Sequence, residues 1–329
     1  MRPDAIFRMA SMTKPITSVA VMILFEEGHF QLGDPVSWYL PAMAGMQPPT
    51  PGAGEPESRE ITILDLLTHT SGLPRSGEDS RHDQVWGNPD LTLQEIIAEI
   101  GQQPLAYPPG TEWRYGRATD ILGYLVEAVS DKPLPEFLEE RIFRPLGMED
   151  TGFFVPEAEA HRVPAAYRVN QEGDTEELWP TLRARETRMP RAPRGAGGLF
   201  STVHDYLRFS QMLLNSGVLD GIRILSPETV EFMLLDHLPN GVALPDEFGL
   251  RYGLSGYGFG LGVRVRVDVA ESQILGNPGE FGWGGAYGTY FLVDPKEELI
   301  AMFFPQLQGS AFFPIRRQFN NAVYQTIIR

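Results

Sequence analysis

The chain of 329 residues contains no cysteine, so disulfide bonds, thiolate catalysis and cysteine-ligated metals are excluded. This absence fits a reducing compartment, and we expect a cytoplasmic location. Residues 1–15 lack the apolar stretch that is typical of a signal peptide. No apolar run approaches the roughly 20 residues that a membrane span requires. We therefore expect no membrane span.

Positive charge is also scarce, with 27 Lys and Arg against 43 Asp and Glu and a net charge of −16. Such a chain repels phosphate backbones and anionic membranes, so we expect no nucleic-acid partner. Only three of the basic residues are lysines, namely Lys14, Lys132 and Lys296. The six histidines form no H-E-x-x-H or comparable pattern, so we expect no metal and no cofactor. The lack of a G-x-S-x-G elbow argues against an α/β-hydrolase.

The pattern of apolar residues predicts an α+β fold. Helices are predicted at about 15–28, 61–69, 92–103, 119–130, 134–144, 204–215, 226–236 and 314–328. Antiparallel strands are predicted at 259–267, 287–293 and 298–304, and surface or connecting loops at 47–60 and 155–195. We expect one catalytic domain over residues 1–329, with a helical region at about 15–250 and a C-terminal sheet and helix at about 255–329.

The segment Ser11-Met12-Thr13-Lys14 places a serine and a lysine on one face at the start of the first helix. A serine hydroxyl is a poor nucleophile until a neighbouring group takes its proton. Lysine can take it where burial or nearby positive potential favours the neutral amine. The helix N-terminus supplies such potential and offers the Ser11 N–H as an oxyanion donor. The spacing also arises by chance, so alone it is suggestive.

Two further segments can complete a site around this serine. Tyr115 lies just before a predicted helix, where a tyrosine can relay a proton to a leaving group, although most such residues are ordinary half-buried aromatics. Trp283, Gly284 and Gly285 stand directly ahead of a predicted strand. Small residues there let a substrate lie against the backbone, and the Ala286 N–H can complete an oxyanion hole. A plain glycine-rich strand entry is the more common meaning.

The order S-x-x-K, Tyr and a glycine-containing triad resembles the class C β-lactamase-like, penicillin-recognising serine hydrolases. That group includes β-lactamases, D-alanyl-D-alanine peptidases and family VIII carboxylesterases. The similarity extends over the whole chain, through FRMASMTKPIT around the serine, LLTHTSGL at 66–73, PGTEWRY at 109–115, GAGGLFST at 195–202 and GTYFLVDP at 288–295.

The resemblance implies a β-lactamase/transpeptidase-like fold, with an antiparallel sheet flanked by helices and a mostly helical second region. It implies Ser11 as the acylated nucleophile, Lys14 and Tyr115 as its activating pair, and the amides of Ser11 and Ala286 as the oxyanion hole. His69 and the glycines of 195–202 resemble structural markers of the family rather than catalytic groups.

Two departures from the family pattern favour an esterase. Lactamases and peptidases usually begin the third motif with Lys or His, which binds a substrate carboxylate, whereas Trp283-Gly284-Gly285 resembles the family VIII carboxylesterases. Arg117 replaces the asparagine of the usual Tyr-x-Asn. We predict a carboxylesterase acting on a small-molecule ester or amide, with Trp283, Gly284, Gly285 and Arg117 binding the substrate.

Two alternatives remain. A D-Ala-D-Ala-type peptidase or weak β-lactamase is favoured if Arg117 points into the cleft. A catalytically silent, ligand-binding relative is the alternative from another class.

Leu299 to Phe304 is a continuous apolar run, typical of a strand inside a sheet and covered on both faces. Its only sequential partner is the strand at 287–293. Relatives usually carry a helix and two strands ahead of the nucleophile, and ten residues are too few for them. We therefore expect these N-terminal elements to be missing, residues 1–10 to be extended and poorly supported, and the free sheet edge to form a homodimer.

Overall fold

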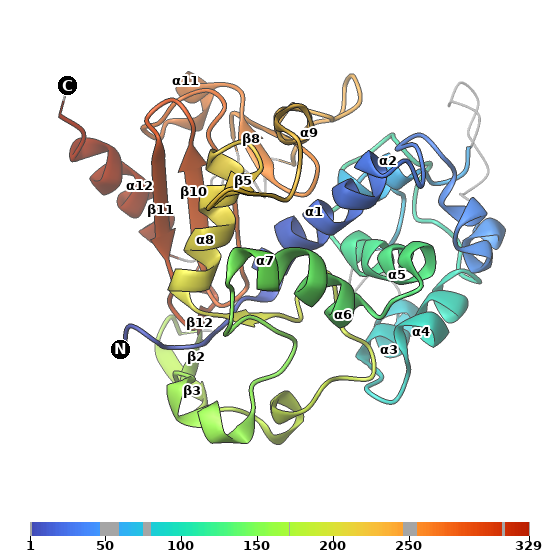
Figure 1. The fold of residues 1–329 in the computed structure, drawn as a ribbon, viewed down its shortest axis with the longest axis horizontal. Helices are drawn as coiled ribbons and strands as arrows, with labels where there is room; N and C mark the ends of the chain where they lie inside the picture. Colours follow the sequence, from blue (N-terminus) through green and yellow to red (C-terminus); the bar gives the residue numbers. More distant parts are fainter. Residues whose placement is uncertain are drawn as a thin grey trace.

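The computed structural model describes residues 2–46, 59–74, 80–170, 172–245, 255–310 and 313–328. It has an antiparallel sheet on one side and a helical region around α1 (Thr13–Glu26) on the other (Figure 1). Helices and antiparallel strands occur together, as expected of an α+β fold. Among the described residues, no helix is both long enough and apolar enough to cross a membrane.

The main sheet is a five-stranded antiparallel meander in the order β11-β10-β9-β8-β7. Its strands are β7 (Tyr257–Phe259), β8 (Arg264–Arg266), β9 (Phe281–Gly284), β10 (Tyr290–Asp294) and β11 (Leu299–Phe303). Helices α8 (Val203–Leu214) and α12 (Ile315–Gln325) cover the sheet (Figure 1). The ring of Tyr206 on α8 contacts Phe291 of β10, whereas Phe319 and Val323 of α12 pack against Tyr290 and Leu292 of the same strand.

The predicted strand at 259–267 is wrong as a single element, because the chain turns back in its middle. Gly262 adopts a φ of 87°, and the Gly260 N–H donates to the Val263 carbonyl at 2.8 Å. A Cβ on Gly262 would meet Ser18 Oγ of α1 at 1.9 Å. The hairpin β7–β8 thus fits against α1, a tertiary contact that alternation along the sequence does not encode. Strand β9 was not predicted.

The helical region surrounds α1, which is buried along most of its length and packs on α5 (Ala118–Ser130). Thr62 and Thr92 begin the next two predicted helices with capping boxes, in which the threonine side chain accepts an N–H of the first turn. The remaining helices are α2 (Ile63–Leu67), α3 (Ser80–Gly87), α4 (Leu93–Ile100), α6 (Leu134–Leu138), α7 (Arg144–Leu146), α9 (Pro227–Met233) and α11 (Val269–Ser272).

The loops predicted at 155–195 contain regular structure. Strands β2 (Ala166–Val169) and β3 (Thr175–Trp179) form a hairpin, and β12 (Leu307–Gln308) adds to it in parallel. Their side chains are mostly exposed or half-buried, so the segment lacks the apolar periodicity on which the prediction relied. The predicted loop at 47–60 falls largely outside the described residues.

The expectation that the first ten residues are poorly supported is wrong for residues 2–10, which the structure describes. Strand β1 (Phe7–Arg8) pairs with β4 (Phe200–Ser201), and Phe7 is buried against Phe304. The Arg8 guanidinium donates two hydrogen bonds to the buried Glu186 carboxylate. Burial alone would raise the pKa of Glu186, but hydrogen bonds from Arg183 and Arg8 hold it at about 2.

Strand β11 lies at an edge of the sheet, because within the described ranges it pairs only with β10. The free edge expected at this strand is present in the described ranges, and most of its side chains are half-buried, although an apolar run is typical of a strand covered on both faces. The ring of Phe303 packs on Phe319 of α12, with centroids 5.6 Å apart. This helix therefore covers one face of the strand.

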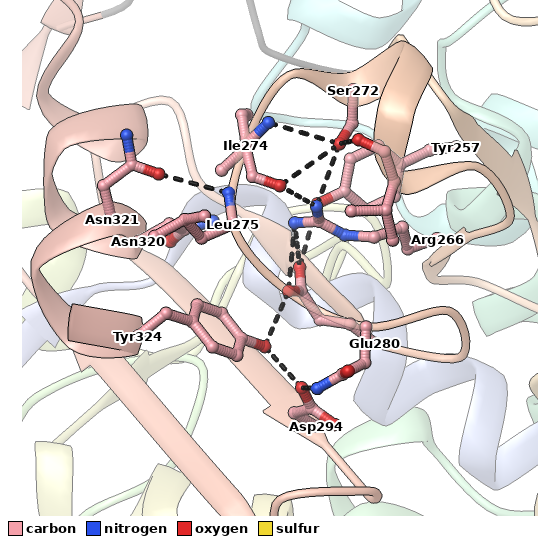
Figure 2. Close-up of polar contacts among 12 residues, drawn as sticks. Tyr257, Arg266, Ser272, Ile274, Leu275, Glu280, Asp294, Asn320, Asn321 and Tyr324 are labelled. Carbon is pink, nitrogen blue, oxygen red and sulfur yellow. Dashed lines mark hydrogen bonds and ion pairs between the residues drawn. The ribbon is translucent and has the colours of Figure 1, made fainter. Parts of the chain in front are cut away.

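A buried polar network joins α12 to the sheet (Figure 2). Arg266 donates to both carboxylate oxygens of Glu280 at 3.0 Å, and both side chains are fully buried. The Tyr324 hydroxyl of α12 lies 2.9 Å from Glu280 Oε2 and 2.6 Å from Asp294 Oδ2, so two carboxylates share its single proton. Burial, and then the charge of Glu280, raise the pKa of Tyr324. The phenol therefore stays protonated and serves as a donor.

Candidate active site

Ser11 and Lys14 are in contact, as their spacing predicted. Ser11 lies in the 3₁₀ turn Ala10–Met12 that leads into α1, and Lys14 lies in the first turn of that helix. Lys14 Nζ donates to Ser11 Oγ at 3.3 Å and to the Ala196 carbonyl at 2.8 Å. The serine is half-buried and the lysine is buried, so the hydroxyl is accessible while the amine is enclosed.

The backbone around Ser11 is strained and held on both sides. Ala10 has a φ of 45°, in the left-handed region that non-glycine residues rarely adopt. Thr13 Oγ1 donates to the Ala10 carbonyl at 2.7 Å and accepts the Leu199 N–H at 3.1 Å. The Met9 N–H donates to the Leu199 carbonyl at 2.9 Å. The segment 195–199 therefore fixes the turn that presents Ser11.

Tyr115 joins the same cluster. Its ring lies beneath Lys14 Nζ, 4.6 Å from the centroid, where the negative face of the ring attracts a cation. Its hydroxyl accepts the indole N–H of Trp283 at 3.3 Å. Loop, helix and sheet thus each supply one member of the cluster, because Tyr115 precedes α5, Lys14 is on α1 and Trp283 is on β9.

His69 also packs in this cluster, although its sequence pattern had indicated only a structural marker. Its ring centroid lies 4.9 Å from that of Tyr115 and 5.5 Å from that of Phe259. The ring is buried, and its Nδ1 has no hydrogen-bond partner among the described residues. Burial, and then the charge of Lys14, hold the pKa of His69 well below its usual value. A neutral imidazole therefore forms one wall beside the tyrosine.

The third motif lies at the end of β9 and just beyond it. Trp283 is buried, and Ala286 is exposed to solvent. Gly285 has no room for a side chain, since a Cβ would lie 2.4 Å from the Met9 carbonyl and 2.2 Å from Thr289 Oγ1. Gly284 faces α12, where a Cβ would meet the Arg316 guanidinium at 2.6 Å. Both glycines permit close packing of β9, and their contact with substrate stays a prediction.

Arg117 makes its contacts away from the serine. Its Nη1 lies 3.6 Å from Asp120 Oδ2, and its guanidinium lies over the Trp86 ring at 5.7 Å. The side chain is about one-third exposed. Its role in substrate binding stays a prediction. The described parts of the chain hold no cluster of three or more His, Asp or Glu side chains suited to a metal ion.

Comparison with known proteins indicates the family of this chain. The Beta-lactamase family model matches residues 1–325. The uncharacterized protein MT1414 of Mycobacterium tuberculosis is 38% identical over 321 residues, covering 93% of this chain and 78% of the relative. Esterase EstB of Burkholderia gladioli is 32% identical over 317 residues, covering 89% of this chain and 75% of that protein.

A solved structure gives the same result. EstCE1, described as a hydrolase with promiscuous acyltransferase activity, superposes with a TM-score of 0.81 and 25% identity, over 98% of this chain and 86% of that one. These matches confirm the predicted fold and the prediction of an enzyme. The chain belongs to the β-lactamase family and is a serine hydrolase of that family.

Proposed function

We propose that the protein is a carboxylesterase that works through an acyl-enzyme on Ser11. The contact between Lys14 Nζ and Ser11 Oγ at 3.3 Å supports this proposal most directly. In the described ranges Lys14 forms no ion pair with a carboxylate, and its amine donates to a hydroxyl and a carbonyl. Ser11 Oγ attacks the ester carbonyl carbon, and its proton passes to the Lys14–Tyr115 pair and on to the leaving alcohol.

The same pair would activate the water that releases the acid and restores Ser11. In the attack, the carbonyl oxygen gains negative charge. We place it between the N–H groups of Ser11 and Ala286, the first at the N-terminus of a buried helix and the second just after β9. Thr289 Oγ1 donates to the Met9 carbonyl at 3.3 Å, which holds the two donor segments together.

Trp283 favours neutral esters over anionic β-lactams. The buried indole lies where related lactamases have a cation, and its N–H donates to Tyr115. A substrate carboxylate there would lose its hydration without gaining a charged partner, which costs at least several kcal/mol. We expect short-chain esters to be cleaved about 10²-fold more efficiently than nitrocefin, roughly 2.7 kcal/mol in transition-state free energy. The similarity to EstB, an esterase, and to EstCE1, a hydrolase with promiscuous acyltransferase activity, supports this choice.

A fluorophosphonate probe followed by mass spectrometry tests the assignment of the nucleophile. We expect one adduct, on Ser11, and loss of both adduct and esterase activity in Ser11→Ala, with circular dichroism unchanged. An adduct on another serine of the active protein would refute Ser11. A panel of nitrophenyl esters, nitrocefin and D-amino-acid amides tests the substrate class, and equal kcat/KM for esters and nitrocefin would favour the lactamase or peptidase alternative.

We also propose that the chain acts as one catalytic domain, because the proposed site takes residues from both the helical region and the sheet. Homodimerisation through the β11 edge stays a prediction. Light scattering that finds a monomer at micromolar concentrations would contradict it. A cytoplasmic location likewise stays a prediction, for cell fractionation to test.

A further inference from the structure

Asp120 is a fully buried carboxylate that the proposed reaction does not use. It lies in the first turn of α5, and its own N–H donates to the Arg117 carbonyl at 2.8 Å. Its Oδ1 accepts the Ala196 N–H at 2.8 Å. Burying a carboxylate is costly, so its partners indicate what it is for.

Ala196 connects Asp120 to the active site, since its carbonyl accepts from Lys14 Nζ at 2.8 Å. One residue thus binds the carboxylate through its N–H and the lysine through its carbonyl. The two hydrogen bonds span the gap between α5 and α1. If the Ala196 backbone moved, Lys14 Nζ would lose its hydrogen bond of 2.8 Å, which is shorter than the one to Ser11 Oγ.

The segment that carries Ala196 is wedged between these two helices. A Cβ on Gly195 would lie 2.7 Å from the Thr119 carbonyl and 3.0 Å from Thr17 Cγ2. Thr17 Oγ1 donates to the Gly195 carbonyl at 2.8 Å. The close packing keeps the segment in place from the sides, while the hydrogen bond to Asp120 sets its position along α5.

The carboxylate also reaches the loop that carries Tyr115. Its Oδ2 is 3.6 Å from Nη1 of Arg117, two residues after the tyrosine. Burial lowers the pKa of Arg194, and the negative charge of Asp120 opposes this shift. The charge of Asp120 therefore acts on two arginines, one in each of the segments that meet Lys14.

We propose that Asp120 is a positioning residue for the base: through Ala196 it fixes Lys14 Nζ against Ser11 Oγ, and through Arg117 it sets the Tyr115 loop around the same amine. The proposal rests on the proposed function, because it assigns Lys14 the task of taking the serine proton. Asp120 itself touches neither substrate nor the reacting atoms. Its effect is on geometry, where a displacement of about 1 Å can cost 10²-fold in rate.

The test compares Asp120→Ala and Asp120→Asn in the full chain with the matched control Asp205→Ala. Asp205 is equally a buried aspartate in the first turn of a helix, and it accepts the Asp150 N–H at 2.8 Å, away from Lys14. Rates are measured on a short-chain nitrophenyl ester and divided by the number of sites that the fluorophosphonate titrates. This correction removes the effect of unfolded protein.

We expect Asp120→Ala to lower kcat per titrated site on the order of 10- to 10²-fold, with KM changed less than about threefold. Asp120→Asn, which keeps an oxygen acceptor for Ala196, should recover a large part of that loss. Asp205→Ala should lower the melting temperature but leave kcat per site unchanged. Equal kcat per site in Asp120→Ala and the wild type would overturn the proposal.

A double-mutant cycle with Lys14 separates this proposal from the function on which it rests. In a Lys14→Ala background, Asp120→Ala should lower the rate of fluorophosphonate labelling less than about twofold, because Asp120 acts through the missing lysine. A further loss as large as in the wild type would overturn the positioning role. Full activity of Lys14→Ala itself would instead refute the proposed function.

Discussion

Two regions of the molecule bury a cation against tyrosine rings, and they differ in whether a carboxylate contacts that cation. On the sheet, the Arg266 guanidinium lies over the Tyr257 ring, with a centroid distance of 4.9 Å. In the candidate active site, Lys14 Nζ lies over Tyr115 at 4.6 Å. The aromatic contacts are alike, so the remaining partners make the difference.

Arg266 belongs to the polar network of α12, where its partners include a negative charge. Arg266 has a bidentate carboxylate in Glu280, which also lies within hydrogen-bonding distance of the Tyr257 and Tyr324 hydroxyls (Figure 2). Within the described residues, the hydrogen-bond partners of Lys14 Nζ are a hydroxyl and a carbonyl. A charge held by an opposite charge is fixed in place, whereas an amine among neutral acceptors can exchange a proton. The first arrangement stabilises the fold and the second suits catalysis.

Breaking the ion pair of Arg266 and Glu280 should give the largest change in stability. Arg266→Met leaves Glu280 buried without its cation, so we expect the free energy of unfolding to fall by about 3–5 kcal/mol. Chemical denaturation measures this, and kcat per titrated site should stay at the wild-type value. As a control, Arg81→Met removes an exposed ion pair with Glu99 and should cost less than about 1 kcal/mol. A similar small loss in Arg266→Met would contradict the comparison.

Breaking the cluster of Lys14 and Tyr115 should instead affect kcat. We expect Lys14→Ala and Tyr115→Phe each to lower kcat on the order of 10²-fold or more, and together far less than the product, because the two act as a unit. The melting temperature should change little in Tyr115→Phe, which keeps the ring beneath Lys14. Multiplicative losses in the double variant would mean that the two residues act separately.

The ion pair of Arg8 and Glu186 tests, at a site near the nucleophile, whether a charge held by an opposite charge stabilises the fold. Its pKa is about 2 in the folded protein against a usual value of 4.5, so its stabilisation is complete above about pH 5 and is lost as pH falls from 4.5 towards 2. Glu186→Gln should cost about 3 kcal/mol at pH 7 and flatten this acid limb. Melting temperatures between pH 7 and 3 measure both, and parallel wild-type and variant curves would refute it.

Trp283 should give the smallest effect, because its hydrogen bond to Tyr115 is neutral and 3.3 Å long. Trp283→Phe removes the N–H and keeps an aromatic wall, so we expect a loss of about fivefold in kcat, near 1 kcal/mol. Trp283→His can restore a donor and should recover part of it. If Trp283→Phe matches the wild type, the indole acts only as a wall.

The sequence predicted most helices and the chemical cluster, because both depend on short spacings. The three-residue step from Ser11 to Lys14 determines their contact on any helix. The pattern of apolar residues also placed α1, α5 and β10 within a few residues of their observed bounds. Short spacings in the sequence therefore predict local geometry.

The rest depends on contacts between distant segments. The turn at Gly262 follows from its fit against Ser18, and the support of Arg8 follows from Glu186, 178 residues away. His69 and Ala196 lay in stretches that were recognised, LLTHTSGL and GAGGLFST, but nothing in those letters says which atoms face the active site. Asp120 gave no signal, because a lone acidic residue in a first helical turn is common.

The contact between the Ser11 turn and the end of β9 has a consequence for how activity arises during folding. Gly285 fits against the Met9 carbonyl, so the two proposed oxyanion donors are brought together by segments about 275 residues apart in the chain. Such long-range closure is slow and forms late, after local helices. Catalytic competence is therefore a property of the last stage of assembly, and partly folded chains with intact helices would be silent in an esterase assay.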